Sequence, residues 1–228
     1  MEQSIKYIFV DEVGRGPAAY DVVVAGISVD LKHSQLLLWD ESLATLNVKD
    51  SKKLTQIKRE QILKDFGIHS MESLFFNKIY TSPLDEFSVD FVLTHRTHEQ
   101  IDNSNILACT LEAMDDAIFL LLKNSNTKED RCFVYIDGNR PPKKCQNLLK
   151  YQCVIKGDSL IKGISLASII AKEYRDFLMD KQDVHYPMYG FKRHKGYLTK
   201  EHQIAIKKFG LCPIHRKSFN LSLYTPNG

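Results

Sequence analysis

The chain has 228 residues, 43% of them hydrophobic and 26% charged, with a formal net charge of +3 at pH 7. These values are ordinary for a globular domain, and the sequence contains neither an apolar run as long as a membrane span nor a signal peptide. The five cysteines have no close metal-type spacing, so we expect reduced thiols in a cytoplasmic protein without membrane contact.

The N-terminal half is predicted to begin with two strands around a glycine-rich turn. Apolar residues dominate both strands, and the short connection favours antiparallel pairing. In chain order, the predicted elements are strands at Lys6–Val10 and Tyr20–Val29, a weak helix at Leu36–Leu46, a helix from its N-cap Thr55 to about Asp65, and a strand at Leu74–Thr81.

The second half alternates long helices with short strands. Apolar residues recur at helical spacing over Ile101–Lys123, and two strands are predicted at Cys132–Ile136 and Gln152–Ile155. A second long helix is expected to begin after Gly163, which leaves Asp158 in the preceding loop. These five strands and interleaved helices predict an α/β fold with a mixed sheet covered by helices.

Carboxylates follow three of the predicted strands. Asp11 and Glu12 end the first strand, and Asp137 and Asp158 follow the two later ones. Any one of these acids could be part of a solvated turn or a helix cap, but acids at strand ends converge at one edge of a sheet. Four carboxylates without a cysteine or histidine pattern favour Mg²⁺ or Mn²⁺ over Zn²⁺.

Basic residues suggest a phosphate-bearing partner. Residues 184–228 contain eight Lys or Arg and one acid, which gives this segment a charge of +7 and the rest of the chain −4. Three lysines in Lys49–Leu54 precede a helix N-terminus, where phosphate oxygens can bind. Tyr189–Tyr197 interleaves aromatic and basic residues, as nucleic-acid contact surfaces do. Exposed lysines and core aromatics remain alternative interpretations of these segments.

The ordered set of motifs resembles the ribonuclease HII family, the type 2 ribonucleases H. The resemblance extends from Asp11 to about Phe219. The motifs are Asp11–Gly16, Lys49–Leu54, Asn105–Ala108 with Thr110, Asp137-Gly138, Lys156–Asp158, Ser168–Lys172 with Arg175-Asp176, Tyr189–Phe191, His194–Tyr197 and His215–Phe219.

The resemblance implies an α/β, ribonuclease H-like mixed five-stranded sheet flanked by helices, with a helical C-terminal part. Residues 1–228 would form one catalytic domain, with about 184–228 completing the substrate groove. The implied enzyme is active as a single subunit with Mg²⁺ or Mn²⁺. It hydrolyses RNA in RNA–DNA hybrids and incises 5′ of ribonucleotides embedded in duplex DNA, leaving 5′-phosphate and 3′-hydroxyl ends.

The resemblance also implies roles for individual residues. The catalytic, metal-binding carboxylates are Asp11, Glu12, Asp137 and Asp158. Asp176 is a rival for the fourth place, which we interpret as a helix-surface residue or part of a structural ion pair. The implied substrate-binding residues are Gly14, Arg15 and Gly16 at the ribose 2′-hydroxyl, Tyr197 at the neighbouring deoxyribose, and Lys52.

Three places depart from the family pattern: Val13 replaces a small residue, Ala18–Asp21 replaces a stretch that commonly contains Gly-Pro, and Leu198 follows the tyrosine. These departures bear on the junction preference and the turnover rate more than on the class of reaction. Two alternatives stay open. One is a DNA-processing nuclease of the same fold, and the other is a non-catalytic protein that binds RNA–DNA hybrids.

Overall fold

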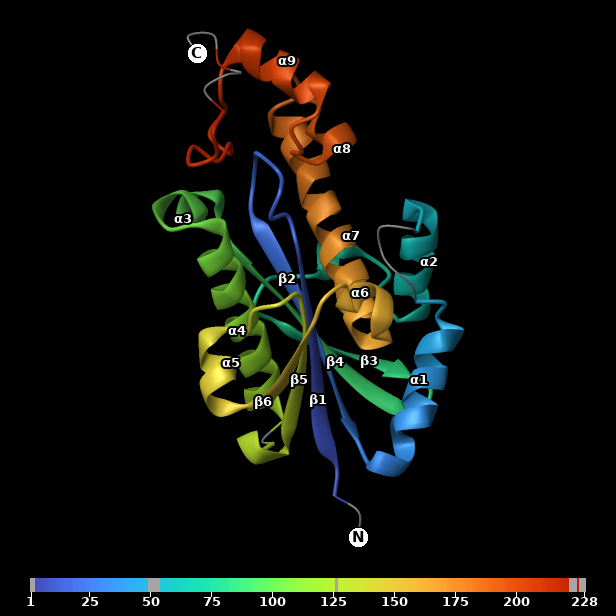
Figure 1. Cartoon of the computed structure of the whole chain (residues 1–228). Helices are drawn as coiled ribbons and strands as arrows, with labels where there is room; N and C mark the ends of the chain where they lie inside the picture. The colour runs from blue at the N-terminus through green and yellow to red at the C-terminus, as the bar shows by residue number, and fades with distance from the viewer. Residues whose placement is uncertain (1–2, 49–53, 126, 222–224, 226–228) are drawn as a thin grey trace.

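The computed structural model describes residues 3–48, 54–125, 127–221 and 225 of the chain. A mixed sheet with the strand order β3-β4-β2-β1-β5-β6 lies at its centre (Figure 1). β1 pairs antiparallel with β2 and parallel with β5, so the two halves of the sheet meet at β1. The strands are β1 Ile5–Val13, β2 Val22–Leu31, β3 Ile79–Leu84, β4 Phe87–Arg96, β5 Cys132–Asp137 and β6 Lys150–Val154.

The expected α/β class with a mixed sheet flanked by helices is confirmed, but the sheet has six strands where five were expected. The strand that the sequence analysis missed is β4, which lies between β2 and β3. Its second half, residues 91–94, is buried throughout, so the run shows little of the alternation by which a half-buried strand is recognised. The predicted strand at Leu74–Thr81 is β3, displaced toward the C-terminus.

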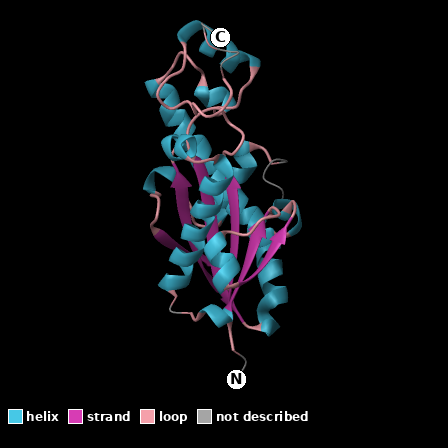
Figure 2. Cartoon of the chain, turned by 60° about the vertical axis from the view of Figure 1, so that its left-hand side comes forward, coloured by secondary structure: helices cyan, strands magenta, loops and turns pink. Residues whose placement is uncertain are grey.

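Helices cover both faces of the sheet (Figures 1 and 2). Alternate residues of β1 separate the two cores: Phe9 faces the core shared with α1, α2 and α7, whereas Ile8 and Val10 face the core shared with α4. The α-helices are α1 Leu36–Thr45, α2 Gln56–Asp65, α3 His98–Asn103, α4 Ile106–Asn124, α5 Lys143–Leu148, α6 Gly157–Leu160, α7 Lys162–His185, α8 Phe191–His194 and α9 Lys200–Phe209. The 3-10 turns are η1 His33–Gln35, η3 Met71–Ser73 and η4 Glu129–Arg131.

The start of α7 differs from the prediction. The helix begins at Lys162 and includes Gly163, which was expected to precede it. A Cβ atom on Gly163 would lie 2.5 Å from carbons of the Phe9 ring. The glycine is therefore required by the close packing of α7 on β1, and this contact outweighs its low helix propensity.

The C-terminal part forms a small core of its own at the end of α7. Tyr189, Phe191 and Ile206 pack there with Met179 of α7 and with Ala19 from the loop between β1 and β2. This core lies with α8 and α9 beyond the edge of the sheet, at the top of Figure 1. It brings the C-terminal segment against the loop that follows the first two acids. In the described part of the chain, no helix has both the length and the apolar character needed to cross a membrane.

Candidate metal centre and the adjacent turn

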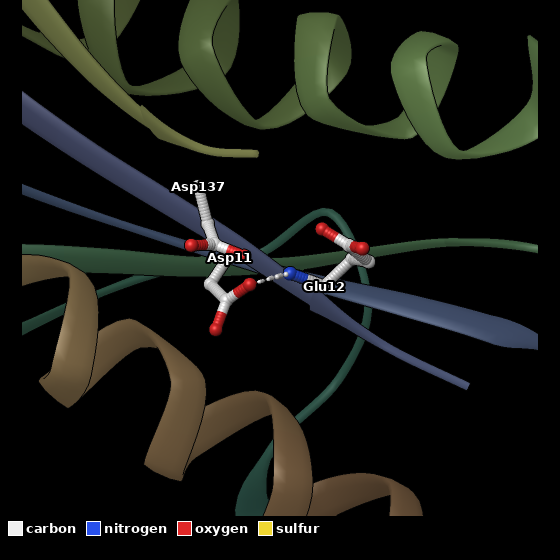
Figure 3. A group of neighbouring side chains, drawn as sticks. All are labelled: Asp11, Glu12 and Asp137. Atoms are coloured by element: carbon white, nitrogen blue, oxygen red, sulfur yellow. Dashed lines mark hydrogen bonds between the residues drawn. The ribbon is translucent and has the colours of Figure 1, made fainter. Parts of the chain in front are cut away.

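Three of the four predicted carboxylates meet where β1 and β5 end. The parallel pairing of these strands stops at Val10 and Ile136, so Asp11 and Asp137 follow at matching positions. Oxygen atoms of Asp11, Glu12 and Asp137 all lie within 4.8 Å of one another (Figure 3). The expected convergence of acids at strand ends therefore holds for these three residues.

Asp11 and Glu12 reach this place from opposite faces of the sheet, because successive residues of a strand point in opposite directions. In Figure 3 the Asp11 carboxylate lies on the side of α7, and the Glu12 carboxylate lies on the side of α4. Asp11 is hydrogen-bonded to Ser168 of α7, whereas Glu12 lines a pocket with Leu111 of α4.

The negative charges of this cluster are poorly balanced by the protein. The pKa of Asp11 is raised well above its usual value, first by burial and then by the charges of Glu12 and Asp137. Burial also raises the pKa of Glu12, although Arg15, whose Nη1 lies 3.2 Å from Glu12 Oε1, opposes the shift. A hard divalent cation would balance these charges and accept the oxygens as ligands.

Hydrogen bonds from the main chain fix two of the acids. The Glu12 N–H donates to Asp11 Oδ1 at 2.7 Å, and the Gly157 N–H donates to Asp137 Oδ1 at 2.7 Å. Both bonds orient a carboxylate oxygen without adding a positive side chain. The cluster therefore keeps its negative charge while its geometry is restrained.

Asp158 is placed differently from the other three acids. It lies in the one-turn helix α6 and not in a loop as predicted, because residues 157–161 form a helical turn directly before α7. Its side chain is buried, yet it is not part of the three-acid group found among the described residues. It directly follows Gly157, the residue bonded to Asp137.

Asp176, the rival for the fourth place, is engaged elsewhere. Both of its carboxylate oxygens accept from Lys172 Nζ at 2.6 Å, and Arg59 Nη2 lies 3.9 Å away. It is buried, so it belongs to an ion pair beneath the surface and not to an exposed helix face. These contacts favour the structural role predicted for it.

The glycine turn lies directly beside the acids. Gly14 has a φ of +95°, a backbone conformation that L side chains rarely adopt. A Cβ atom on Gly16 would be 3.6 Å from Cε1 of the Tyr197 ring, so this ring borders the turn. Arg15 is half-exposed, and Tyr197 is 44% exposed. The predicted juxtaposition of the turn and Tyr197 is therefore present.

The remaining residues singled out in the sequence have different positions in the structure. Tyr189 and Phe191 are buried in the C-terminal core, so their aromatic rings serve packing. Lys52 lies outside the described residues. Thr55 caps α2 as predicted, since its side chain accepts a hydrogen bond from the Lys58 N–H.

The sequence analysis missed Asn139 and Arg140. With Glu12, Asp137 and Arg15 they line a pocket of about 300 Å³ beside the carboxylates. Both side chains are exposed and follow the turn at Gly138. Their position directly after Asp137 could have identified them. The Asp137-Gly138 pair made this less evident, because Asp-Gly pairs are common in ordinary loops.

Comparisons with known proteins give the same family that the sequence motifs resemble. A family model for Ribonuclease HII matches residues 8–222. Ribonuclease HII of Shewanella woodyi is 39% identical over 215 residues, covering 92% of this chain and 85% of that protein. The ribonuclease H2 from Pyrococcus horikoshii OT3 is similar with a TM-score of 0.64 and 25% identity, covering 96% of each chain. Bst-RNase HIII in complex with Mn²⁺ has the same fold, with a TM-score of 0.61 and 18% identity over 98% of this chain and 70% of that chain.

Proposed function

The chain belongs to the ribonuclease HII family, whose members cleave RNA within RNA–DNA hybrids and at embedded ribonucleotides, and we propose that Asp11, Glu12, Asp137 and Asp158 form its catalytic metal centre. The cluster of three buried or half-buried carboxylates at the ends of β1 and β5 carries this proposal. Asp158 is included because it directly follows the residue that is hydrogen-bonded to Asp137.

The donor set suits Mg²⁺ or Mn²⁺, and a solved protein of the same fold, Bst-RNase HIII, was crystallised with Mn²⁺. Bound divalent ions supply an activated water and stabilise the leaving 3′ oxygen in an in-line displacement. Asp11 and Asp137 would hold the ions from adjacent strands, with their oxygens oriented by the N–H groups of Glu12 and Gly157. The products would carry 5′-phosphate and 3′-hydroxyl ends.

Recognition of the ribonucleotide is proposed for the turn beside the acids. The 2′-hydroxyl distinguishes RNA from DNA, and main-chain groups of Gly14, Arg15 and Gly16 can approach it closely. Tyr197 borders Gly16, where its exposed ring can pack against the next sugar. Residues 184–228 would complete the groove, and Lys52 would contact a phosphate. The proposed substrates therefore include DNA duplexes with embedded ribonucleotides, bound by a single subunit.

The decisive assay uses a duplex with one embedded ribonucleotide, incubated with Mg²⁺, with Mn²⁺ or with a chelator, and maps the cut. We expect incision 5′ of the ribonucleotide that needs the metal. An all-DNA duplex is the substrate control, and equal cleavage of both duplexes would indicate a DNA-processing nuclease. Tight binding of the ribonucleotide duplex without cleavage in either metal would indicate a non-catalytic protein.

Variants of the acids test the site assignment. Asp11→Asn, Asp137→Asn and Asp158→Asn should each lower the cleavage rate by about a thousandfold or more, because each removes a ligand of the ion that stabilises the transition state. Asp176→Asn is the matched control, since this buried aspartate is held by Lys172. Full activity of Asp158→Asn together with loss of activity in Asp176→Asn would show that Asp176, and not Asp158, is the fourth catalytic carboxylate.

A further inference from the structure

Two fully buried arginines, Arg175 and Arg216, lie behind the glycine turn. Arg175 projects from α7, and its guanidinium donates to the main-chain oxygens of Ala19 at 3.1 Å, Asp21 at 3.0 Å and Lys195 at 2.9 Å. The first two acceptors belong to the loop between β1 and β2, and the third lies two residues before Tyr197. One side chain thus connects α7 to both walls of the proposed ribose site.

Arg216 binds the turn itself. Its guanidinium donates to the main-chain oxygens of Gly14 at 2.6 Å, Arg15 at 3.1 Å, Pro17 at 2.8 Å and Tyr20 at 2.7 Å. The five N–H donors of an arginine in their fixed planar arrangement suit such a set of acceptors, whereas lysine has three donors at one point. Arg216 therefore fixes the direction of several peptide units at once.

The direction of those peptide units matters for the substrate. In a trans peptide the C=O and N–H groups point in opposite directions, and the chain contains no cis bond among the described residues. Since the oxygens of Gly14 and Arg15 point toward Arg216, the N–H groups of Arg15 and Gly16 point away from it. Neither N–H donates a hydrogen bond to another described residue.

Main-chain hydrogen bonds extend this arrangement to the tyrosine. The Ala18 N–H donates to the oxygen of Gly196 at 2.8 Å, and the Arg216 N–H donates to the oxygen of Ala18 at 2.9 Å. The ring of Phe219 lies 5.0 Å from Arg216 Cζ and covers the guanidinium. The turn, the Tyr197 loop and the Arg216 segment are consequently held as one unit.

Burying two positively charged guanidinium groups near each other costs free energy. Among the described residues neither guanidinium forms an ion pair; both cations are bonded directly to main-chain carbonyls, and the more distant charge of Asp21 also favours them. Burial lowers the pKa of both arginines, that of Arg216 to about 9, with Arg175 adding to the shift of Arg216. Arg216 is still protonated at neutral pH, so it keeps its full set of hydrogen-bond donors there.

We infer that Arg216, supported by Arg175, is a positioning residue that turns the N–H groups of Arg15 and Gly16 outward to read the ribose 2′-hydroxyl. This inference rests on the proposed function, because it assigns those N–H groups to the ribose of that substrate. Neither arginine would touch the nucleic acid itself. The observation that carries the inference is the set of carbonyl acceptors at Gly14 and Arg15.

The test is the preference of the protein for a ribonucleotide, measured as a ratio. Dissociation constants are measured in Ca²⁺ for two fluorescent duplexes that differ only in one ribonucleotide or deoxyribonucleotide, using wild type and Arg216→Lys. Any loss of folded protein changes both constants in proportion and leaves their ratio unchanged. We expect wild type to prefer the ribonucleotide, and Arg216→Lys to lose about fivefold of this preference, which is the effect of one or two hydrogen bonds.

Arg59→Lys is the matched control. Arg59 is also buried, but it binds Glu173 and the Leu54 oxygen, and none of the hydrogen bonds described above for the turn involves it. Its exchange should change stability and leave the preference unchanged. Phe219→Leu is a milder variant for use if Arg216→Lys does not fold, and it should lower the preference in the same direction.

The possible results separate the inference from the proposed function. Wild type that neither prefers nor cleaves the ribonucleotide duplex would refute the proposed function. Wild type with a clear preference that Arg216→Lys and Phe219→Leu both retain in full would refute the positioning role alone. A lower preference in Arg59→Lys of the same size would also refute it, because the effect would then not be specific to the turn.

Discussion

Replacing Gly14 by alanine tests how tightly the turn is held against Arg175. The added Cβ atom would lie 2.3 Å from Arg175 Nε, 2.7 Å from its Cδ and 2.9 Å from the main-chain oxygen of Asp21. Arg175 and Asp21 are both buried and are hydrogen-bonded to each other, so the added methyl group fits only if one of them shifts. We therefore expect Gly14→Ala to displace Arg175 and to break its hydrogen bond to Asp21.

The expected loss of stability has two parts. Alanine at a φ of +95° costs about 1–2 kcal/mol of backbone strain. Loss of a hydrogen bond from a buried charged donor costs about 1.5–3 kcal/mol. Together these two losses should lower the free energy of unfolding by about 2.5–5 kcal/mol, and the melting temperature of a chain of this size by about 10 °C.

Gly138→Ala is the control, because Gly138 has a φ of +102° but a Cβ atom added there would meet no described atom within 4 Å. It should show the backbone strain alone, a loss of about 1–2 kcal/mol. Urea unfolding and thermal melts of both variants, recorded without metal, measure the difference. If Gly14→Ala is no less stable than Gly138→Ala, the reasoning that Arg175 leaves no room for a side chain at Gly14 is wrong.

Three further predictions concern the site and the C-terminal core. Burial raises the folded-state pKa of Asp11 and Glu12. The metal-free protein should therefore be most stable at low pH and should lose stability as the pH rises through and above the usual pKa range of these carboxyl groups. In chelator, Asp11→Asn should therefore unfold at higher urea than wild type at pH 7, with the gap closing as pH falls; a constant gap would contradict this. Burial lowers the pKa of both His202 and His215 to about 4, so stability should be lost as pH falls from about 6.5 toward 4, by about 1.4 kcal/mol per pH unit for each. NMR of the imidazoles should show no titration between pH 7 and 5, and a midpoint near 6.5 would refute it. Tyr197→Ala should slow cleavage at a single ribonucleotide by about tenfold and leave the Mn²⁺-induced rise in melting temperature unchanged, since the ring borders the turn and not the acids; unchanged cleavage kinetics would remove its role.

Much of this architecture is encoded locally and was therefore predictable. The acids at Asp11, Glu12 and Asp137 were recognisable because they come at the ends of short apolar runs that predict strands. The helix N-cap at Thr55 was also recognisable, because the capping pattern extends over only four residues. Such features need only near neighbours in sequence.

The features that were missed depend on distant partners. β4 is buried by α4 on one face and on the other by aromatic residues of α1 and the end of α2, Trp39 against Phe87 and Phe66 against Phe91, which no local pattern reveals. Gly163 enters a helix because Phe9 lies against it. The carbonyl partners of Arg216 are about two hundred residues away in sequence. A buried arginine looks like any surface arginine until the fold brings those oxygens to it.

The alternation of Asp11 and Glu12 across the sheet also limits how the chain can change length. One inserted or deleted residue within 6–10 would exchange the faces of the two acids and separate them from Asp137. The tight turn at Asp85 and Glu86, which joins β3 to β4 at the far side of the sheet, has no such constraint. Insertions in this protein should therefore be tolerated at that turn and excluded from β1, where they would separate the three carboxylates.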